Sequence, residues 1–240
     1  MKILVVIPTY NEKENIQRLV EKILHLSLSL SVLIIDDNSP DGTGEIADKL
    51  ASEYSPVKVI HRSGNPSEGL SRRDGYRYAI INNYDYVIEM DADFSHNPEE
   101  IPKFLEQIRD WDVVIGSRFI NGSKQVGRSI FRRFGSRFAN FYIRKMLKIE
   151  NIRDCGSGYR CYRRSVLEKV DLSEGSFTGP ASLIKTLFRC YQSGFKIKEI
   201  PITYYPRVGK SKLRTFKDGF RHLTLIIKEF TYHDKPLYQS

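Results

Sequence analysis

The sequence contains little cysteine and no long uncharged apolar run. Its three cysteines, Cys155, Cys161 and Cys190, are odd in number and lack the two-residue spacing typical of zinc sites. This favours inert thiols in a reducing, cytosol-facing compartment. The longest uncharged apolar stretch, residues 23–35, is too short to span a bilayer. Since Met1 and Lys2 lead directly into a strand-like segment, we expect no signal peptide.

Glycine is missing from the turn after the first strand-like segment. That turn reads PTYNEKEN, and an acidic residue stands where a bound pyrophosphate would need bare backbone amides. The dinucleotide-binding fingerprint of Rossmann domains and the P-loop are therefore both absent. Any diphosphate bound at this turn must be neutralised by another group.

The chain is basic, with a net charge of +9 over 240 residues. Such a charge favours an anionic partner, either nucleic acid, a membrane surface or a phosphorylated substrate, and does not choose among them. The length fits one α/β domain, residues 1–240, with no linker and no internal repeat.

Apolar runs and helical periodicity alternate along the first half of the chain, which predicts an α/β fold with a mostly parallel sheet and helices on both faces. Beyond Arg118 the alternation breaks down, and residues 216–230 form an amphipathic tail. The pattern predicts strands at 3–8, 32–35, 57–60, 84–90, 111–117, near 160 and at 195–207, and helices at 12–26, 43–50, 74–82, 95–108, near 164 and at 181–191.

Polar side chains follow several of these strands. Asp91 and Asp93 come directly after an apolar run with one residue between them, so they project to the same side. Carboxylates are hard ligands for Mg²⁺ or Mn²⁺, and Ser95 can add a neutral oxygen; solvated loop acids are the alternative. Ligands bind at the carboxyl ends of strands in such sheets. The residues at these ends are Tyr10, Glu12, Asp37, Asp91 and Asp93.

A basic and aromatic segment spans residues 128–148, with seven Lys or Arg residues and no acid. Its aromatic side chains recur at three- and four-residue steps, as on one face of a helix. That face can lie on a membrane with arginines at lipid phosphates, or it can pack on the core; the sequence leaves both open. No nucleic-acid-binding motif accompanies the charge. The aromatic residues are Phe131, Phe134, Phe138, Phe141 and Tyr142, flanked by Arg133, Arg137 and Arg144.

Five stretches together carry a family resemblance: VVIPTYNEKENI, IIDDNSPDGT, MDADFSHNPEEIP, GSRF and RDCGSGYRCYRRSVLEKV. In this order and spacing they resemble glycosyltransferase family 2, which has the GT-A fold, and within it the dolichol-phosphate mannosyltransferase type. The resemblance implies a nucleotide-binding half, residues 1–118, and an acceptor-binding half, residues 119–240, that ends in an amphipathic helix.

The resemblance also implies roles for individual residues. The metal, Mg²⁺ or Mn²⁺, is expected on Asp91, Asp93 and Ser95, and Asp91, Asp93 and Arg118 are the expected catalytic residues. The acceptor phosphate is expected on Arg132, Ser136 and Arg137, with Asn140 in the same pattern. The register of the late basic loop is open between Lys210 and Lys212. The expected donor-binding residues are Pro8, Tyr10, Glu12, Ile35, Asp37, Asp91, Ala92, Asp93, Arg118, Arg207 and Lys212.

The activity implied is inverting, metal-dependent transfer of a hexose, mannose from GDP-mannose, to a dolichyl or undecaprenyl phosphate. We expect a peripheral protein on the cytoplasmic side of an anionic membrane, with a separate membrane-embedded subunit as a possible partner and no nucleic acid. UDP-glucose is the alternative donor. Because residues 177–183 contain no acid where the family commonly has one, a non-catalytic binder of sugar nucleotides or lipid phosphates is a second alternative.

Overall fold

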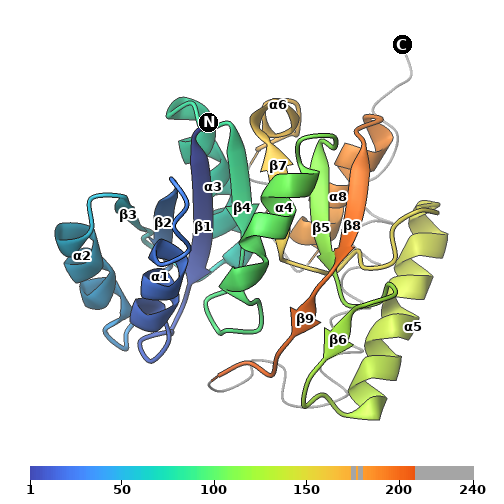
Figure 1. Cartoon of the computed structure of the whole chain (residues 1–240), viewed down its shortest axis with the longest axis horizontal. Helices are drawn as coiled ribbons and strands as arrows, with labels where there is room; N and C mark the ends of the chain where they lie inside the picture. The colour runs from blue at the N-terminus through green and yellow to red at the C-terminus, as the bar shows by residue number, and fades with distance from the viewer. Residues whose placement is uncertain (174–176, 178–180, 209–240) are drawn as a thin grey trace.

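The structure, a computed structural model, describes residues 1–173, 177 and 181–208, which form a seven-stranded sheet with helices on both faces (Figure 1). The strand order is β3-β2-β1-β4-β7-β5-β8, and β7 alone runs antiparallel to its neighbours. The predicted α/β, mostly parallel architecture is thus confirmed. The strands of this sheet are β1 (Ile3–Thr9), β2 (Ser31–Asp36), β3 (Val57–His61), β4 (Tyr86–Glu89), β5 (Val113–Ser117), β7 (Arg160–Arg163) and β8 (Ile197–Pro201).

The two faces of the sheet bury separate apolar clusters. Along β1, Ile3, Val5 and Ile7 belong to one cluster and Leu4 and Val6 to the other, because successive side chains of a strand point to opposite faces. Helices α1, α2 and α4 cover the first face, and α3, α6, α8 and part of α5 cover the second. Their bounds are α1 (Ile16–Leu24), α2 (Thr43–Glu53), α3 (Glu68–Ile81), η1 (Pro98–Glu100), α4 (Ile101–Gln107), α5 (Ile130–Leu147), α6 (Arg164–Leu167) and α8 (Ser182–Gln192).

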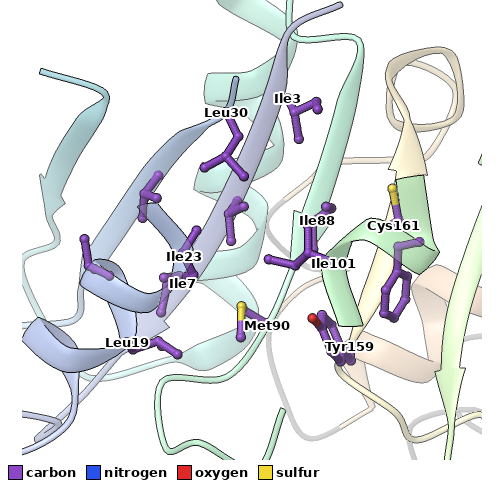
Figure 2. Close-up of a cluster of buried hydrophobic side chains, with 14 of the residues drawn as sticks. Ile3, Ile7, Leu19, Ile23, Leu30, Ile88, Met90, Ile101, Tyr159 and Cys161 are labelled. Atoms are coloured by element: carbon purple, nitrogen blue, oxygen red, sulfur yellow. The ribbon is translucent and has the colours of Figure 1, made fainter. Parts of the chain in front are cut away.

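The first cluster supports the segment that follows β4. Figure 2 shows Ile7, Met90 and Tyr159 among its members, close to where β1 and β4 end. The Tyr159 hydroxyl donates to the carbonyl of Asn97 at 2.9 Å, which ties this core to the chain beyond the strand. The positions of the strand ends are therefore fixed by a packed interior.

All three cysteines lie in the interior as free thiols. Burial raises the pKa of Cys155 and of Cys190 to about 12, and it raises the pKa of Cys161 as well. Since the thiolate is the reactive form, these side chains are inert at neutral pH, as predicted.

Three predicted helix starts are wrong. The helix predicted from residue 95 begins at Pro98 as the 3-10 turn η1 and continues as α4 from Ile101. Helix α1 begins at Ile16 rather than Glu12, because residues 12–15 form a turn in which the Asn15 and Ile16 amides both donate to the Glu12 carbonyl. Helix α3 begins at Glu68 rather than Asp74, with the Ser67 hydroxyl capping it by accepting from the Leu70 amide. A glycine near its start fits the close packing there, since a Cβ at Gly69 would lie 2.0 Å from the Phe177 carbonyl oxygen.

The predicted strand over residues 195–207 is two strands. After β8 the chain continues into β9 (Thr203–Tyr204), which pairs in parallel with β6 (Lys124–Gln125) in a separate two-stranded sheet. The predicted tail, residues 216–230, lies outside the described residues. Within the described part of the chain, none of the helices combines the length and apolar character needed to cross a membrane.

Candidate active site

Strands β1, β2 and β4 end at one edge of the sheet, the lower edge in Figure 1. A pocket opens beyond these ends, and eight of the predicted donor-binding residues line it. Polar side chains, most of them acidic, dominate the lining. The lining residues are Pro8, Thr9, Tyr10, Glu12, Asp37, Pro66, Glu68, Ser71, Asp91, Ala92, Asp93 and Arg207.

Glu12 is held in place within the turn after β1. Its carboxylate accepts from Asn15 Nδ2 at 2.8 Å and from Arg207 Nη2 at 3.1 Å, and its backbone amide donates to the Thr43 hydroxyl at 3.0 Å. Since α1 begins four residues later, Glu12 does not belong to the first turn of that helix. Its carboxylate faces the pocket instead.

Asp37, which follows β2, positions the part of the pocket lining that comes from α3. The carboxylate accepts from Arg62 Nε at 3.0 Å and from the Ser67 amide, and the side chain is almost fully buried. Because Ser67 caps α3, Asp37 fixes the start of the helix that contributes Glu68 and Ser71 to the pocket.

Asp91 and Asp93 both line the pocket, as their spacing predicts. The Asp91 side chain is 36% exposed and that of Asp93 only 11%. Asp93 Oδ1 accepts from the Ser95 amide at 3.0 Å, and the Asp91 amide donates to His96 Nδ1 at 3.0 Å. Both carboxylates thus belong to the same pocket, and that of Asp93 is the more buried.

Negative charge accumulates around Asp91. Partial burial, with Glu68 and Asp93 close by, raises the pKa of the Asp91 carboxyl to about 8. The buried guanidinium of Arg72 opposes this, since it pairs with Glu89 and Glu68 and lies 3.9 Å from Asp91 Oδ1. One arginine thus pairs with three carboxylates. Negative charge is left over around Asp91, and a further cation would stabilise it.

The oxygen donors fit a divalent ion that arrives with a phosphate. Asp91 and Asp93 supply two carboxylates. The third predicted ligand, Ser95, is not among the lining residues, and its buried hydroxyl has no hydrogen-bond partner among the described residues. Within the described ranges, there is no group of three or more His, Cys, Asp or Glu side chains able to hold a metal. Mg²⁺ is typically bound by one or two carboxylates together with substrate phosphates, and Mn²⁺ takes similar oxygen ligands.

A segment from the far end of the chain crosses the pocket and brings Arg207 to it. The Tyr205 amide donates to the Ser95 carbonyl at 3.2 Å, and the Val208 amide donates to the Asp93 carbonyl at 2.9 Å. Arg207 Nε lies 3.3 Å from Asp93 Oδ2, while Nη2 reaches the carboxylate of Glu12. One arginine therefore pairs with two acids of the pocket, Glu12 and Asp93.

Three predicted donor-binding residues are not brought to this pocket. Ile35 is fully buried, and its side chain packs in the core near Gly75. Arg118, also a predicted catalytic residue, donates from Nε and Nη2 to Asp154, each at 2.7 Å, and does not line the pocket. Lys212, like its alternative Lys210, lies outside the described residues.

Four lining residues were not predicted: Thr9, Pro66, Glu68 and Ser71. The last three depend on the early start of α3. The signal for that start was the serine at position 67 followed by an acid, a common pattern at helix N-termini.

The predicted acceptor residues lie on α5, apart from the pocket lining. Arg132 and Arg137 are exposed, and neither makes an ion pair with another described residue. The Ser136 hydroxyl donates to the Arg133 carbonyl at 3.1 Å, and the buried Asn140 side chain accepts from the Gly156 amide. Asn140 thus anchors the helix to the loop that precedes β7.

The aromatic face of α5 is exposed. Relative exposure is 82% for Phe131, 73% for Phe134, 57% for Phe138, 54% for Phe141 and 43% for Tyr142. The alternative in which this face packs on the core is wrong, because only Asn140, Ile143 and Leu147 of the helix are buried. The exposed, N-terminal half of α5 points toward the same lower edge in Figure 1 at which the strands end.

Comparison with known families agrees with this geometry. The model of glycosyl transferase family 2 matches residues 4–171, which include β1, β4 and the acids after them. The chain belongs to glycosyltransferase family 2.

Relatives of known activity cover most of the chain. It is 39% identical over 214 residues to the undecaprenyl-phosphate mannosyltransferase of Micrococcus luteus, covering 89% of this chain and 88% of the relative. It is 39% identical over 213 residues to the polyprenol monophosphomannose synthase of Mycolicibacterium smegmatis, covering 88% and 80%. With the dolichol-phosphate mannosyltransferase of Pyrococcus furiosus it shares 36% identity, covering 95% of this chain and 64% of the relative.

Solved structures of glycosyltransferases share the fold. The mannosyltransferase PcManGT of Pyrobaculum calidifontis, in complex with GDP-Man and Mn²⁺, superimposes with a TM-score of 0.67 at 16% identity, covering 95% of this chain and 64% of that one. The glucosyl-3-phosphoglycerate synthase of Mycobacterium tuberculosis, in complex with Mn²⁺ and UDP, gives a TM-score of 0.68 at 16% identity, covering 96% and 79%. The fold of this family 2 chain is thus the GT-A fold.

Proposed function

We propose that this glycosyltransferase moves mannose from GDP-mannose to a polyprenyl phosphate at a membrane surface. The observation that carries the proposal is the edge shared by the acidic pocket and the exposed aromatic face of α5. A lipid-linked acceptor requires that arrangement, because its headgroup must reach the donor while its chain stays in lipid. The names of the relatives, two of them at 39% identity, support mannose and a polyprenyl phosphate as the substrates.

The residues at the ends of β1, β2 and β4 bind the donor. Tyr10, Glu12 and Asp37, which line the pocket, would receive the nucleoside, and Asp91 and Asp93 would hold Mg²⁺ or Mn²⁺ together with the diphosphate. The bound metal would supply positive charge to the leaving diphosphate. Arg207 complements it, because a diphosphate entering the pocket offers Arg207 an anion in place of Glu12 and Asp93.

The acceptor needs little activation by the protein. A phosphate monoester has a second pKa of about 6, so it is largely dianionic at neutral pH and is already a nucleophile. We therefore assign no general base. The chain contributes alignment, with the acceptor oxygen held behind the anomeric carbon so that displacement inverts its configuration.

Membrane association in this proposal is peripheral and depends on α5. The phenylalanines dip into the interface, and the arginines beside them meet anionic headgroups. A separate membrane-embedded subunit remains compatible with this arrangement.

The proposal is tested by incubating the pure protein with undecaprenyl phosphate, Mn²⁺ and one labelled donor at a time. We expect label from GDP-mannose in the lipid phase, none with undecaprenol in place of its phosphate, and none in excess chelator. Label from UDP-glucose instead would show that the protein is a glycosyltransferase of this class that transfers glucose rather than mannose. Binding of GDP-mannose without transfer to any lipid would contradict the proposal and favour a non-catalytic binder.

A further inference from the structure

Two arginines lie over one tyrosine ring at the border between the pocket and α5. The guanidinium of Arg118 is 5.4 Å from the ring centroid of Tyr204, and that of Arg128 is 5.6 Å from it. Arg118 is fully compensated by its bidentate pairing with Asp154. Arg128 donates to the neutral Oε1 of Gln125 at 3.1 Å and makes no ion pair with a carboxylate among the described residues.

The charge around Arg128 is in surplus. Burial lowers its pKa, and the nearby Arg118 and Arg132 act in the same direction, while Tyr204 and Asp154 oppose them only in part. An arginine that is half-buried among other arginines costs folding free energy unless an anion joins it. The surplus therefore indicates a site for an anionic ligand.

The position of Arg128 in the fold identifies the ligand. On one side, Tyr204 forms a β-bridge to His96, the two rings are 6.3 Å apart, and His96 Nδ1 lies 3.7 Å from Asp91 Oδ2. On the other side, α5 begins two residues after Arg128 and presents its exposed phenylalanines from Phe131 onward. Arg128 thus stands between the metal-binding acids and the face assigned to lipid.

We propose that Arg128 binds the phosphate of the lipid acceptor and presents it to the donor pocket. This inference rests on the proposed function. A guanidinium fork grips two oxygens of a phosphate monoester, and stacking on Tyr204 fixes the plane of the fork in advance. The neighbouring Arg118 stays paired with Asp154, so Arg128 is the guanidinium available to the phosphate. Arg128 comes in addition to the acceptor residues predicted from the sequence, of which Ser136 already donates its hydroxyl proton within its own helix.

The test uses a short, water-soluble prenyl phosphate, so that vesicle binding plays no part. Wild type, Arg128→Gln and Arg128→Lys are compared, with Lys124→Gln as the control, because Lys124 is an exposed cation four residues away with no assigned role. Acceptor KM and donor KM are measured separately. Calorimetry measures binding of the prenyl phosphate, and of the prenol that lacks the phosphate, without donor.

We expect Arg128→Gln to raise the acceptor KM roughly tenfold or more, the effect of losing a charged hydrogen bond, and to leave the donor KM within about twofold. Arg128→Lys should be intermediate, since it keeps the charge and loses the fork. Lys124→Gln should match wild type. Calorimetry should show the same order for the phosphate, and no dependence on residue 128 for the prenol.

An unchanged acceptor KM in Arg128→Gln overturns the inference, and so does an equal rise in both KM values, which would indicate a structural role. If Arg128→Gln does not fold, Arg128→Lys decides by the same criterion. Absence of transfer by wild type, with Arg128-dependent binding of the prenyl phosphate, would refute the proposed function and leave this site standing.

Discussion

Replacing Phe134 and Phe138 together by serine separates a membrane-facing helix from a core helix. Their relative exposures are 73% and 57%, so only about a quarter and two-fifths of their surfaces are covered. Full burial of a phenylalanine side chain stabilises by about 1.5–3 kcal/mol, so the double variant should lose about 1–2 kcal/mol. Two fully buried phenylalanines would instead cost about 6–10 kcal/mol on truncation.

The assay for this cost is thermal unfolding. For a domain of this length, 1 kcal/mol corresponds to roughly 2–4 °C in Tm, so the double variant should lose less than about 8 °C. Its binding to vesicles should fall much further than its stability, because the removed side chains are those that we propose enter lipid.

The flanking arginines provide the second measurement. Each basic residue near an anionic membrane contributes about 1 kcal/mol, so Arg133→Ala/Arg137→Ala should weaken vesicle binding roughly thirtyfold. Both side chains are exposed, so the Tm should change little. Wild-type binding should rise with anionic lipid and fall as salt screens the charges. A collapse in Tm for the serine variant, with vesicle binding indifferent to the arginines, would refute the account of α5.

Three further predictions concern the pocket and the pH dependence of stability. Asp93→Asn should reduce transfer by orders of magnitude and weaken Mn²⁺ binding, while Tm is retained. Mn²⁺ binding is measured by electron paramagnetic resonance with GDP present, and unchanged binding would show that Asp93 is not a metal ligand. Arg207→Ala should lower kcat with little change in acceptor KM, because the charge of Arg207 is assigned to the departing diphosphate. A change confined to the acceptor KM would indicate that Arg207 binds the acceptor instead. The hydrogen bond from His61 to Asp48 raises the pKa of His61, and the side chain is about half exposed. The pairing therefore stabilises the fold fully below about pH 6.5 and is lost as pH rises through the folded pKa, so His61→Gln should cost more unfolding free energy in urea at pH 5.5 than at pH 8.5. Equal costs at both pH values would contradict this assignment.

The sheet and the strand-end residues could be predicted because their signals are local. Buried parallel strands are continuous apolar runs, and each run here ends in a polar group that the parallel topology brings to one edge. Tyr10, Asp37 and Asp91 were found in this way.

Some errors come from local signals that were overlooked, and others from contacts distant in sequence. Helix α3 starts at a local serine cap, Ser67, whereas the close approach of the Phe177 carbonyl to Gly69, more than a hundred residues away, could not be predicted. Arg118 follows a strand end as predicted, and its guanidinium is bound by Asp154, 36 residues on. The periodicity of α5 identified its aromatic face, but periodicity alone does not say whether such a face meets core or solvent.

The central claim is tested most directly by one rate. It is the initial rate at which label from GDP-mannose enters undecaprenyl phosphate embedded in anionic vesicles with Mn²⁺ present. The account predicts rapid labelling by wild type, at least a hundredfold slower labelling by Asp93→Asn, in keeping with loss of a metal-assisted step, and none in excess chelator. Labelling that continues at the wild-type rate in Asp93→Asn or in chelator would contradict it.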